Sequence, residues 1–480
     1  MERHANFIGG AWLPPQDGRY YQRENPAHPE QMIGEFPAST VADVDAAVAS
    51  AKSALAGWSS TPGPKRGALL FRFAELLEQS KEKLARIITL EQGKALCESQ
   101  GEVGRAAVEA RYMAGEASRP FGHSYPSERP GVVCYTVTEP IGVVAAICPW
   151  NFPVVTPVRK MAPALAFGNT VVLKPASLTP WSSIFLMRLI EEAGFPMGVA
   201  NLVVGPGAAI GDALVSDRRV AGISFTGSTL IGTRLCSMAA TRLAPTQLEL
   251  GGKNPAVVID YDDLQGAAQE IVSAAFQCTG QRCTALSRVI VLDSQASDLV
   301  EKIVSEVKRI KVGDGISAET TMGPLVSMGQ FQTTAGYVKQ AELEGLSAIT
   351  GGKPLVSEPA TEGYYYGATV FDGVSPSSPL AQEEIFGPVL PVIRVRDVDE
   401  AISIANATNY GLAAALFSSR RDVIARFAAT IEAGMIHINH GTASQAHVPF
   451  GGRKDSGQGA FSIGPTAREF FTQVKTIYAK

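Results

Sequence analysis

Short apolar runs alternate with helix-like patterns through the middle of the chain. The first series of such runs occupies residues 142–147, 170–173, 201–204 and 222–225. Continuous apolar runs separated by helices indicate parallel strands that are buried on both faces of a sheet. We therefore predict an α/β fold in which this region forms a doubly wound nucleotide-binding domain.

A second series of apolar runs begins beyond Gly252. Residues 256–259, 287–292 and 411–417 are expected to form strands, and residues 296–310 have the spacing of an amphipathic helix. This pattern predicts a second α/β domain. The two series meet near Gly252, and ligand clefts tend to form at such junctions between domains.

The segments outside these two series have patterns of their own. Helical spacing dominates from Thr40, which begins a sequence similar to a capping box, to about Ser118. Residues 132–138 have the β-branched composition of an extended strand. A strand outside the main sheets needs a partner for its backbone groups, so we expect a small additional β element.

Length and composition limit the possible classes of protein. A chain of 480 residues is too long for one simple core, so two or three domains are expected. Hydrophobic residues at 45% and charged residues at 18% are typical of an ordinary globular α/β enzyme. The net charge of −4 provides no basic surface for nucleic acid or an anionic membrane, so neither is an expected partner.

The N-terminal sequence and the cysteine content indicate the compartment. Residues 1–8 lack the apolar core of a signal peptide, and no window approaches the run of about eighteen apolar residues that spans a bilayer. We expect a cytoplasmic protein whose six cysteines are reduced thiols. None of the six histidines has metal-ligand spacing to a cysteine or carboxylate, so no metal site is predicted.

A candidate nucleophile lies in the segment Phe276–Ala285. Cys283 follows the polar residues Gln281 and Arg282 rather than an apolar run, and the adjacent guanidinium charge favours a thiolate. A packed structural cysteine is the alternative. A lone carboxylate, Glu249, interrupts an apolar strand 34 positions earlier, just before paired glycines.

Two further polar positions follow strands of the first series. Asn151 comes after the first strand, at the end of the sheet where ligands bind, and its amide is a neutral hydrogen-bond donor. Gly227 and Ser228 end the run 222–225 and open a helix whose N-terminus can face a pyrophosphate. A simple helix-capping role is the alternative for each of these positions.

Taken together, these motifs resemble those of the aldehyde dehydrogenase superfamily. The matching segments occur in the family's order and cover nearly the whole chain; they are residues 149–153, 173–180, 247–255, 280–283, 383–389 and 449–457. The resemblance implies that the Cys283 thiolate attacks an aldehyde and that Glu249 activates the water that hydrolyses the thioester. It also implies that the Asn151 side chain and the Cys283 backbone N–H hold the oxyanion.

The same resemblance implies residues that bind NAD or NADP. These are Trp150, Lys174, Gly227, Ser228, Glu384 and Phe386. One position departs from the family pattern, because many NAD-using relatives have a glutamate where this chain has Ser177. That glutamate repels the 2′-phosphate of NADP, so Ser177 predicts that NADP is tolerated or preferred.

The resemblance also suggests how the chain divides into domains. Residues 1–121 and 142–250 would form the NAD(P)-binding domain, and residues 251–465 the catalytic domain. Residues 122–141 and 466–480 would form oligomerisation strands, which implies a homodimer or homotetramer.

The substrate is the least determined part of the prediction. Arg159 follows Asn151 by eight residues, at a position where succinic semialdehyde dehydrogenases bind a substrate carboxylate, and residues 280–289 look similar to the ketoglutarate semialdehyde branch. We therefore predict a small aldehyde that carries a carboxylate, bound by Arg159. An aliphatic or aromatic aldehyde, a coenzyme-A-acylating reaction and a noncatalytic scaffold are the alternatives.

Overall fold

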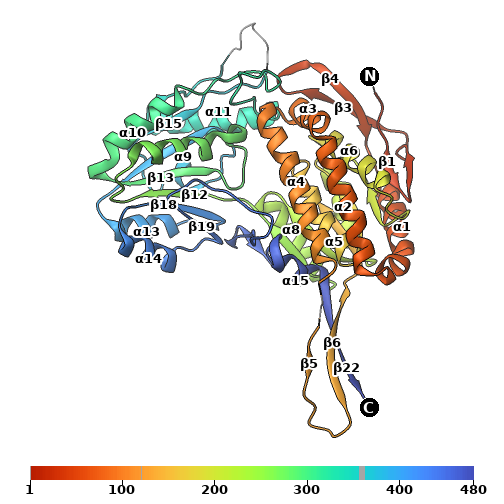
Figure 1. The fold of residues 1–480 in the computed structure, drawn as a ribbon. Helices are drawn as coiled ribbons and strands as arrows, with labels where there is room; N and C mark the ends of the chain where they lie inside the picture. Colours follow the sequence, from red (N-terminus) through yellow and green to blue (C-terminus); the bar gives the residue numbers. More distant parts are fainter. Residues whose placement is uncertain (1, 120–121, 356–362) are drawn as a thin grey trace.

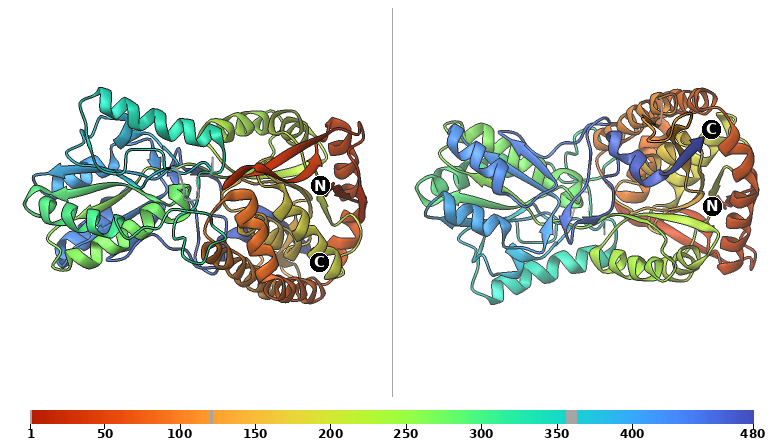
Figure 2. Two further views of the ribbon diagram at one scale, coloured as in Figure 1. Left: turned by 90° about the horizontal axis from the view of Figure 1, so that it is seen from above. Right: turned by 90° about the horizontal axis from the view of Figure 1, so that it is seen from below.

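Two sheets, each covered by helices on both faces, make up most of the protein in a computed structural model (Figures 1 and 2). The structure describes residues 2–119, 122–355 and 363–480. The first sheet has the order β2-β1-β9-β8-β7-β10-β11-β21. Its strands are Ala11–Leu13, Asn6–Ile8, Ala200–Leu202, Thr170–Lys174, Val143–Ile147, Val220–Thr226, Thr246–Glu249 and Gly457–Gln458, in that order.

The five central strands of the first sheet, from β9 to β11, are parallel. Along β7, Val144 and Ala146 face one apolar cluster, whereas Val143 and Ala145 face another. The first cluster is covered by α2, α4, α5 and α6, and the second by α1, α7 and α8. The sheet is thus buried on both faces, which explains the continuous apolar runs and confirms the predicted doubly wound fold.

Helices α1 to α8 surround the first sheet, and α1 and α8 begin where the sequence predicts, after Thr40 and after Ser228. In order from α1 to α8 they are Val41–Ser60, Gly63–Gln79, Lys81–Gln92, Leu96–Glu116, Val155–Ala166, Pro180–Glu192, Gly207–Ser216 and Thr229–Ala240. At the start of α1, the Thr40 backbone N–H donates to the Asp43 carboxylate at 2.8 Å, as the capping sequence predicted. The antiparallel pair β3 (Tyr20–Asn25) and β4 (His28–Pro37) lies beside these helices.

The second sheet has the order β14-β15-β16-β13-β12-β18-β19. Its strands are Ala348–Thr350, Thr369–Phe371, Val389–Val395, Leu286–Leu292, Asn254–Val258, Ala413–Phe417 and Met435–Ile438, in that order. Helices α9 (Leu264–Phe276) and α10 (Asp293–Val307) cover one face. The other face is covered by α11 (Met328–Leu343), α13 (Val398–Asn406) and α14 (Arg421–Thr430).

Two predicted boundaries in this region differ from the structure. The helix expected at residues 296–310 begins at Asp293 and ends at Val307. The strand expected at 411–417 is divided, because Tyr410–Gly411 (β17) pairs with Arg453–Lys454 (β20) in a separate small sheet. Only the apolar part, β18, enters the main sheet.

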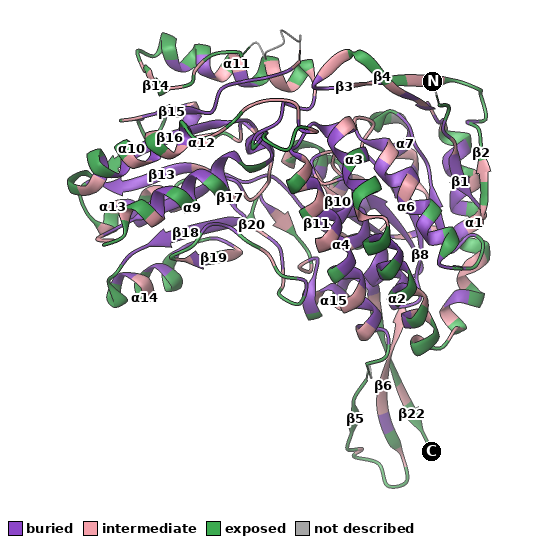
Figure 3. Cartoon of the chain, turned by 45° about the horizontal axis from the view of Figure 1, so that its top comes forward, coloured by how far each residue is buried: buried purple, intermediate pink, exposed green. Residues whose placement is uncertain are grey.

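A three-stranded arm projects from the body of the protein (Figure 1). It has the order β22-β6-β5, with β22 at Thr472–Ala479, β6 at Val133–Pro140 and β5 at Ser124–Tyr125. The C-terminal strand pairs antiparallel with β6 along its whole length, so the isolated strand at 132–138 has the expected partner. Figure 3 shows that much of this arm is exposed or half-buried, whereas the two main sheets are buried.

Two features of the described residues bear on partners. Within these ranges, no helix is both long and apolar enough to cross a membrane. The same residues contain no group of three or more His, Cys, Asp or Glu side chains placed to hold a metal ion.

Candidate active site

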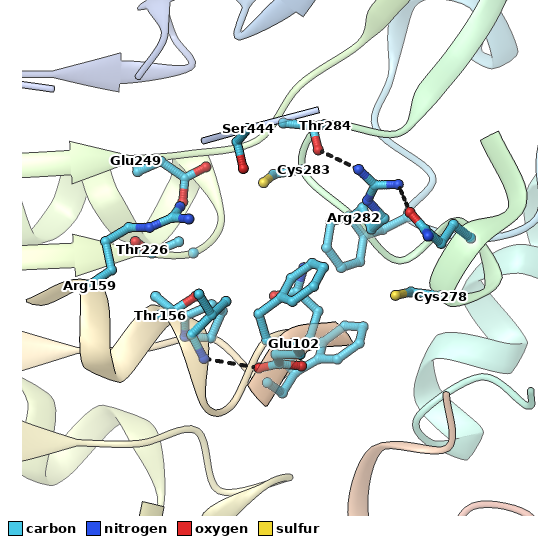
Figure 4. A pocket seen from close by; sticks show the side chains of 18 of the residues that line it. Glu102, Thr156, Arg159, Thr226, Glu249, Cys278, Arg282, Cys283, Thr284 and Ser444 are labelled. Atoms are coloured by element: carbon cyan, nitrogen blue, oxygen red, sulfur yellow. Dashed lines mark hydrogen bonds between the residues drawn. The ribbon is translucent and has the colours of Figure 1, made fainter. Parts of the chain in front are cut away.

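A cavity of about 550 Å³, which we call the central cavity, collects side chains from segments far apart in the sequence (Figure 4). Nine of the eleven predicted site residues line it: Trp150, Asn151, Arg159, Gly227, Ser228, Glu249, Cys283, Glu384 and Phe386. Strands β7, β10 and β11 of the first sheet end at or just before residues that line this cavity. The loop of Cys283, which leads into β13 of the second sheet, also lines it. Folding therefore brings the predicted nucleophile, carboxylate and amide to one place.

An unusual turn positions Cys283. Cys278, Thr279 and Gly280 have positive φ angles of 53°, 60° and 69°, so three successive residues adopt the left-handed conformation. At Gly280 a Cβ atom would lie 2.3 Å from the Gly387 carbonyl oxygen, which requires glycine there. Strained turns of this kind persist where the surrounding structure holds them, often at functional sites. The Asn254 side chain holds the C-terminal end of this loop, because it donates a hydrogen bond to the Cys283 carbonyl at 2.7 Å.

The charges around Cys283 differ from the sequence-based interpretation. Burial raises the pKa of the Cys283 thiol well above its ordinary value, and the nearby Glu249 carboxylate raises it further. Arg159 is the cation that lowers this pKa. Arg282, expected to favour the thiolate, instead donates to the Gln277 and Thr284 side chains, as Figure 4 shows. Burial and Glu249 thus favour the neutral thiol over the thiolate, and Arg159 opposes them.

Glu249 ends β11 and is buried beside the thiol. Burial raises the pKa of this carboxyl group, whereas the Arg159 charge and the Cys283 thiol lower it. Its Oε1 atom has no hydrogen-bond partner among the described residues. A buried carboxylate with a free oxygen at a cavity wall is well suited to take a proton from water.

Asn151 is held by a buried ion pair that the sequence analysis missed. The Lys94 ammonium donates to the Asn151 carbonyl at 2.6 Å and to the Glu102 carboxylate at 2.8 Å. The other Glu102 oxygen accepts from the backbone N–H groups of Val154 and Val155 at the start of α5. The available signal was a charged residue, Glu102, among the apolar positions of a helical pattern.

The Asn151 side chain itself points to the nucleophile loop. Its Nδ2 atom donates to the Gln281 carbonyl at 2.9 Å, two residues before Cys283. A primary amide has two N–H donors, so one remains for a further acceptor in the cavity.

The predicted cofactor residues form one wall of the central cavity. Trp150 and Phe386 meet edge to face with 5.2 Å between ring centroids. Glu384 accepts from the Gly252 backbone N–H at 2.9 Å, and burial raises its pKa to about 7. Ser228 is the N-cap residue of α8, and its side chain makes no capping hydrogen bond.

Lys174 is the last residue of β8, Ser177 lies in the loop that follows, and neither lines the central cavity. The Lys174 ammonium donates to the Pro175 carbonyl at 2.9 Å, and burial lowers its pKa to about 8. The Ser177 carbonyl accepts from the Tyr21 hydroxyl at 3.1 Å. The N-terminal strand β3 therefore supports the loop of Ser177.

Arg159, on α5, already has a carboxylate partner. Its guanidinium donates to both oxygens of Glu109, at 3.1 and 2.8 Å, and lies over the Phe450 ring. Burial would lower the pKa of Arg159, but Glu109 and Glu249 outweigh it and raise this pKa. The sequence predicted a substrate carboxylate as the partner of Arg159 and gave no indication of Glu109.

Comparisons with solved structures define the class of protein first. A structure described as an NAD-dependent aldehyde dehydrogenase from Sinorhizobium meliloti matches with a TM-score of 0.97 and 34% identity, covering 100% of this chain and 95% of that one. A structure described as an NADP-dependent enzyme from E. coli matches with a TM-score of 0.96 and 34% identity, covering 100% and 98%. The protein is an oxidoreductase that has the same fold as these two structures.

The sequence comparisons then identify the family. The model of the aldehyde dehydrogenase family matches residues 12–477. The alpha-ketoglutaric semialdehyde dehydrogenase of Bacillus subtilis strain 168 is 40% identical over 478 residues, covering 99% of this chain and 98% of the relative. The chain belongs to the aldehyde dehydrogenase family, which confirms the resemblance drawn from its motifs.

Proposed function

We propose that this enzyme oxidises an aldehyde to the carboxylic acid with NAD(P)⁺, using Cys283 as nucleophile, Glu249 as general base and Asn151 as oxyanion donor. The observation that carries this assignment is that these three side chains line one cavity although they come from three separate segments. A coenzyme-A-acylating reaction needs no base for water, so the buried Glu249 beside Cys283 favours hydrolysis.

The chemistry proceeds in two stages. In the first, the Cys283 thiol releases its proton to water and its sulfur bonds to the aldehyde carbon. The carbonyl oxygen becomes an oxyanion that accepts from the Asn151 amide and the Cys283 backbone N–H. NAD(P)⁺, when bound, would supply the hydride acceptor, so that breaking the C–H bond at this carbon would give a thioester on Cys283. In the second, Glu249 takes a proton from water, the hydroxide bonds to the carbonyl carbon, and the C–S bond breaks to release the acid.

Asn151→Ala tests the oxyanion role. The substitution removes the free N–H donor while the Lys94 contact to the backbone carbonyl at this position is retained. Loss of one such donor typically lowers kcat by about 10²–10³-fold. Steady-state kinetics should show this fall in kcat with little change in cofactor affinity, and an unchanged kcat would contradict the role.

The residues present fit a dinucleotide. Gly227 and Ser228 precede α8, whose first backbone N–H groups lack a side-chain cap and can receive a pyrophosphate. Glu384 would hold the nicotinamide ribose, with Phe386 and Trp150 beside the ring. Lys174, at the end of β8, would bind the adenine ribose. We propose that either NAD or NADP serves, because Ser177 brings no carboxylate to the 2′-position.

Ser177→Glu tests this cofactor assignment. A carboxylate at residue 177 would repel the 2′-phosphate, a group that only NADP⁺ carries. The ratio of kcat/KM for NADP⁺ to that for NAD⁺ should fall by about tenfold or more, equivalent to about 1.4 kcal/mol. Ser177→Gln, which has the same shape without the charge, is the control. Equal ratios in the two variants would mean that the ribose lies elsewhere.

We propose a carboxylate-bearing aldehyde as the substrate. Arg159 and two further arginines, Arg105 and Arg282, line the central cavity, and the Bacillus relative acts on alpha-ketoglutaric semialdehyde. A panel of semialdehydes, aliphatic aldehydes and aromatic aldehydes with each cofactor, followed by the absorbance of the reduced nicotinamide, tests both activity and class. A preference for long aliphatic or aromatic aldehydes would contradict the class, and no turnover with any aldehyde would favour a noncatalytic scaffold.

We also propose that the arm formed by β5, β6 and β22 joins copies of the chain in a homodimer or homotetramer. Exposed apolar side chains on its strands, Val133, Val474 and Tyr478, support this role. The division of the chain into domains at residues 121, 141, 250 and 465, and a cytoplasmic location, remain predictions from the sequence.

A further inference from the structure

Arg105 is a charged residue of the central cavity that the proposed chemistry does not use. It lies on α4, and its Nε atom donates to the Glu109 carboxylate at 2.9 Å. A second nitrogen donates to the Ser444 backbone carbonyl. The remaining nitrogen, NH2, is buried and has no hydrogen-bond partner among the described residues. A guanidinium donor without an acceptor is costly, which makes this an incomplete site.

The ion pairs at this wall leave positive charge uncompensated. Glu109 is the shared carboxylate of Arg105 and Arg159, and Arg159 takes both of its oxygens. Two guanidinium groups therefore share the Glu109 carboxylate; Glu249 acts on Arg159 through its charge but forms no ion pair with either arginine among the described residues. Charges removed from water are most stable when they are paired, so a further carboxylate at Arg105 would be favourable.

Arg282 is a third guanidinium at this cavity, and unlike Arg105 and Arg159 it has no carboxylate partner among the described residues. Within the described part of the chain it forms no ion pair, and its hydrogen bonds go to neutral acceptors: Gln277, Thr284 and the Thr442 carbonyl. Arg105 and Arg282 thus both donate to the segment 442–444, from α4 and from the nucleophile loop respectively. The two arginines and Ser444 line the central cavity together with Cys283.

We propose that Arg105, assisted by Arg282, binds the carboxylate at the far end of the substrate, whereas Arg159 stays paired with Glu109. Arg159 is then a positioning residue, whose charge acts on Glu249 and Cys283 rather than on the substrate carboxylate. A bidentate guanidinium–carboxylate contact would give Arg105 the acceptor that it lacks. This inference rests on the proposed function, because it assumes an aldehyde that carries a second, acidic end.

The test compares two five-carbon aldehydes, 5-oxopentanoate and pentanal, which differ in the terminal carboxylate. In Arg105→Met, kcat/KM for 5-oxopentanoate should fall by about tenfold or more, mainly through KM, because a charge-assisted contact is lost. The value for pentanal should change by less than about threefold, since pentanal makes no such contact. Arg282→Gln should show the same selectivity for the acid.

Matched variants separate recognition from packing. Arg111→Met removes the same charge from α4 at a surface ion pair with Glu78, and should leave both substrates unaffected. Arg105→Lys keeps the charge without the forked donor, so its loss should be confined to the acid and smaller than that of Arg105→Met. If Arg105→Met does not fold, as judged by thermal unfolding, the lysine variant gives the decision.

The outcomes distinguish this inference from the proposed function. A wild-type enzyme that prefers pentanal would overturn the acid-bearing substrate class itself. A wild-type preference for 5-oxopentanoate with equal losses on both substrates in Arg105→Met and Arg105→Lys would overturn only the role of Arg105. A selective loss on the acid in Arg159→Gln, with Arg105→Met unaffected, would return the role to Arg159.

Discussion

Replacing Cys283 by alanine is expected to abolish aldehyde oxidation, because the proposed thioester forms on the sulfur of this residue, beside Glu249. Loss of a covalent nucleophile typically lowers kcat by about 10⁴-fold or more. The alanine removes only a sulfur atom, so NAD(P)⁺ binding, followed by quenching of tryptophan fluorescence, should survive. Absorbance of the reduced nicotinamide on adding an aldehyde measures the loss.

Cys278 provides the matched control for this prediction. It lies five residues before Cys283 and also lines the central cavity, but the carboxyl groups that act on its thiol are Glu98 and Glu102, whereas Glu249 acts on Cys283. Cys278→Ala should therefore keep most of the activity. Activity retained in Cys283→Ala together with its loss in Cys278→Ala would show that Cys278, and not Cys283, is the nucleophile.

Glu249→Gln is expected to separate the two stages of the reaction. Glutamine keeps the shape of the side chain but takes no proton from water, so hydride transfer should proceed once and hydrolysis should stall. Stopped-flow absorbance should show a burst of one reduced nicotinamide per site, followed by a steady rate lower by about 10²–10⁴-fold. A folded variant that gives no burst would mean that Glu249 is needed before hydride transfer, to deprotonate Cys283.

The pH dependence of the steady-state rate provides a second test of Glu249 as the general base. Burial raises the pKa of Glu249, and only its deprotonated form acts as a base. The wild-type rate limited by hydrolysis should therefore fall as pH decreases through this raised pKa, which lies above that of an ordinary glutamic acid, about 4.3. The residual rate of Glu249→Gln should lack this dependence.

The parts of this account that local sequence determines were predictable. The buried parallel strands follow from continuous apolar runs, and Val143–Ile147 is one of them. Glu249 and Asn151 were identifiable because each is a polar residue at or after an apolar strand, and Cys283 because it is a thiol among polar residues. Their motifs also resemble a known family. The pairing of β6 with β22 was implied only by that resemblance.

The partners of buried charges were not predictable. Glu109 precedes Arg159 by 50 positions, and nothing in either segment indicates that α4 and α5 bring the two side chains together. The same holds for Lys94 beneath Asn151. The direction of Arg282 was also misread, because adjacency in the sequence does not place a side chain against its neighbour's sulfur. Such pairings depend on which helices pack against each other. The periodicity of apolar residues predicts which face of a helix is buried, but not which element covers that face.

The central claim, a thioester on Cys283 that Glu249 hydrolyses, is tested most directly by the intact mass of Glu249→Gln after mixing with NAD(P)⁺ and an aldehyde substrate. The account predicts a mass increase of one acyl group in place of one hydrogen, located on Cys283 by peptide mapping and absent from the double variant with Cys283→Ala. A full burst of reduced nicotinamide without a covalent adduct, or an adduct on Cys278, would contradict it.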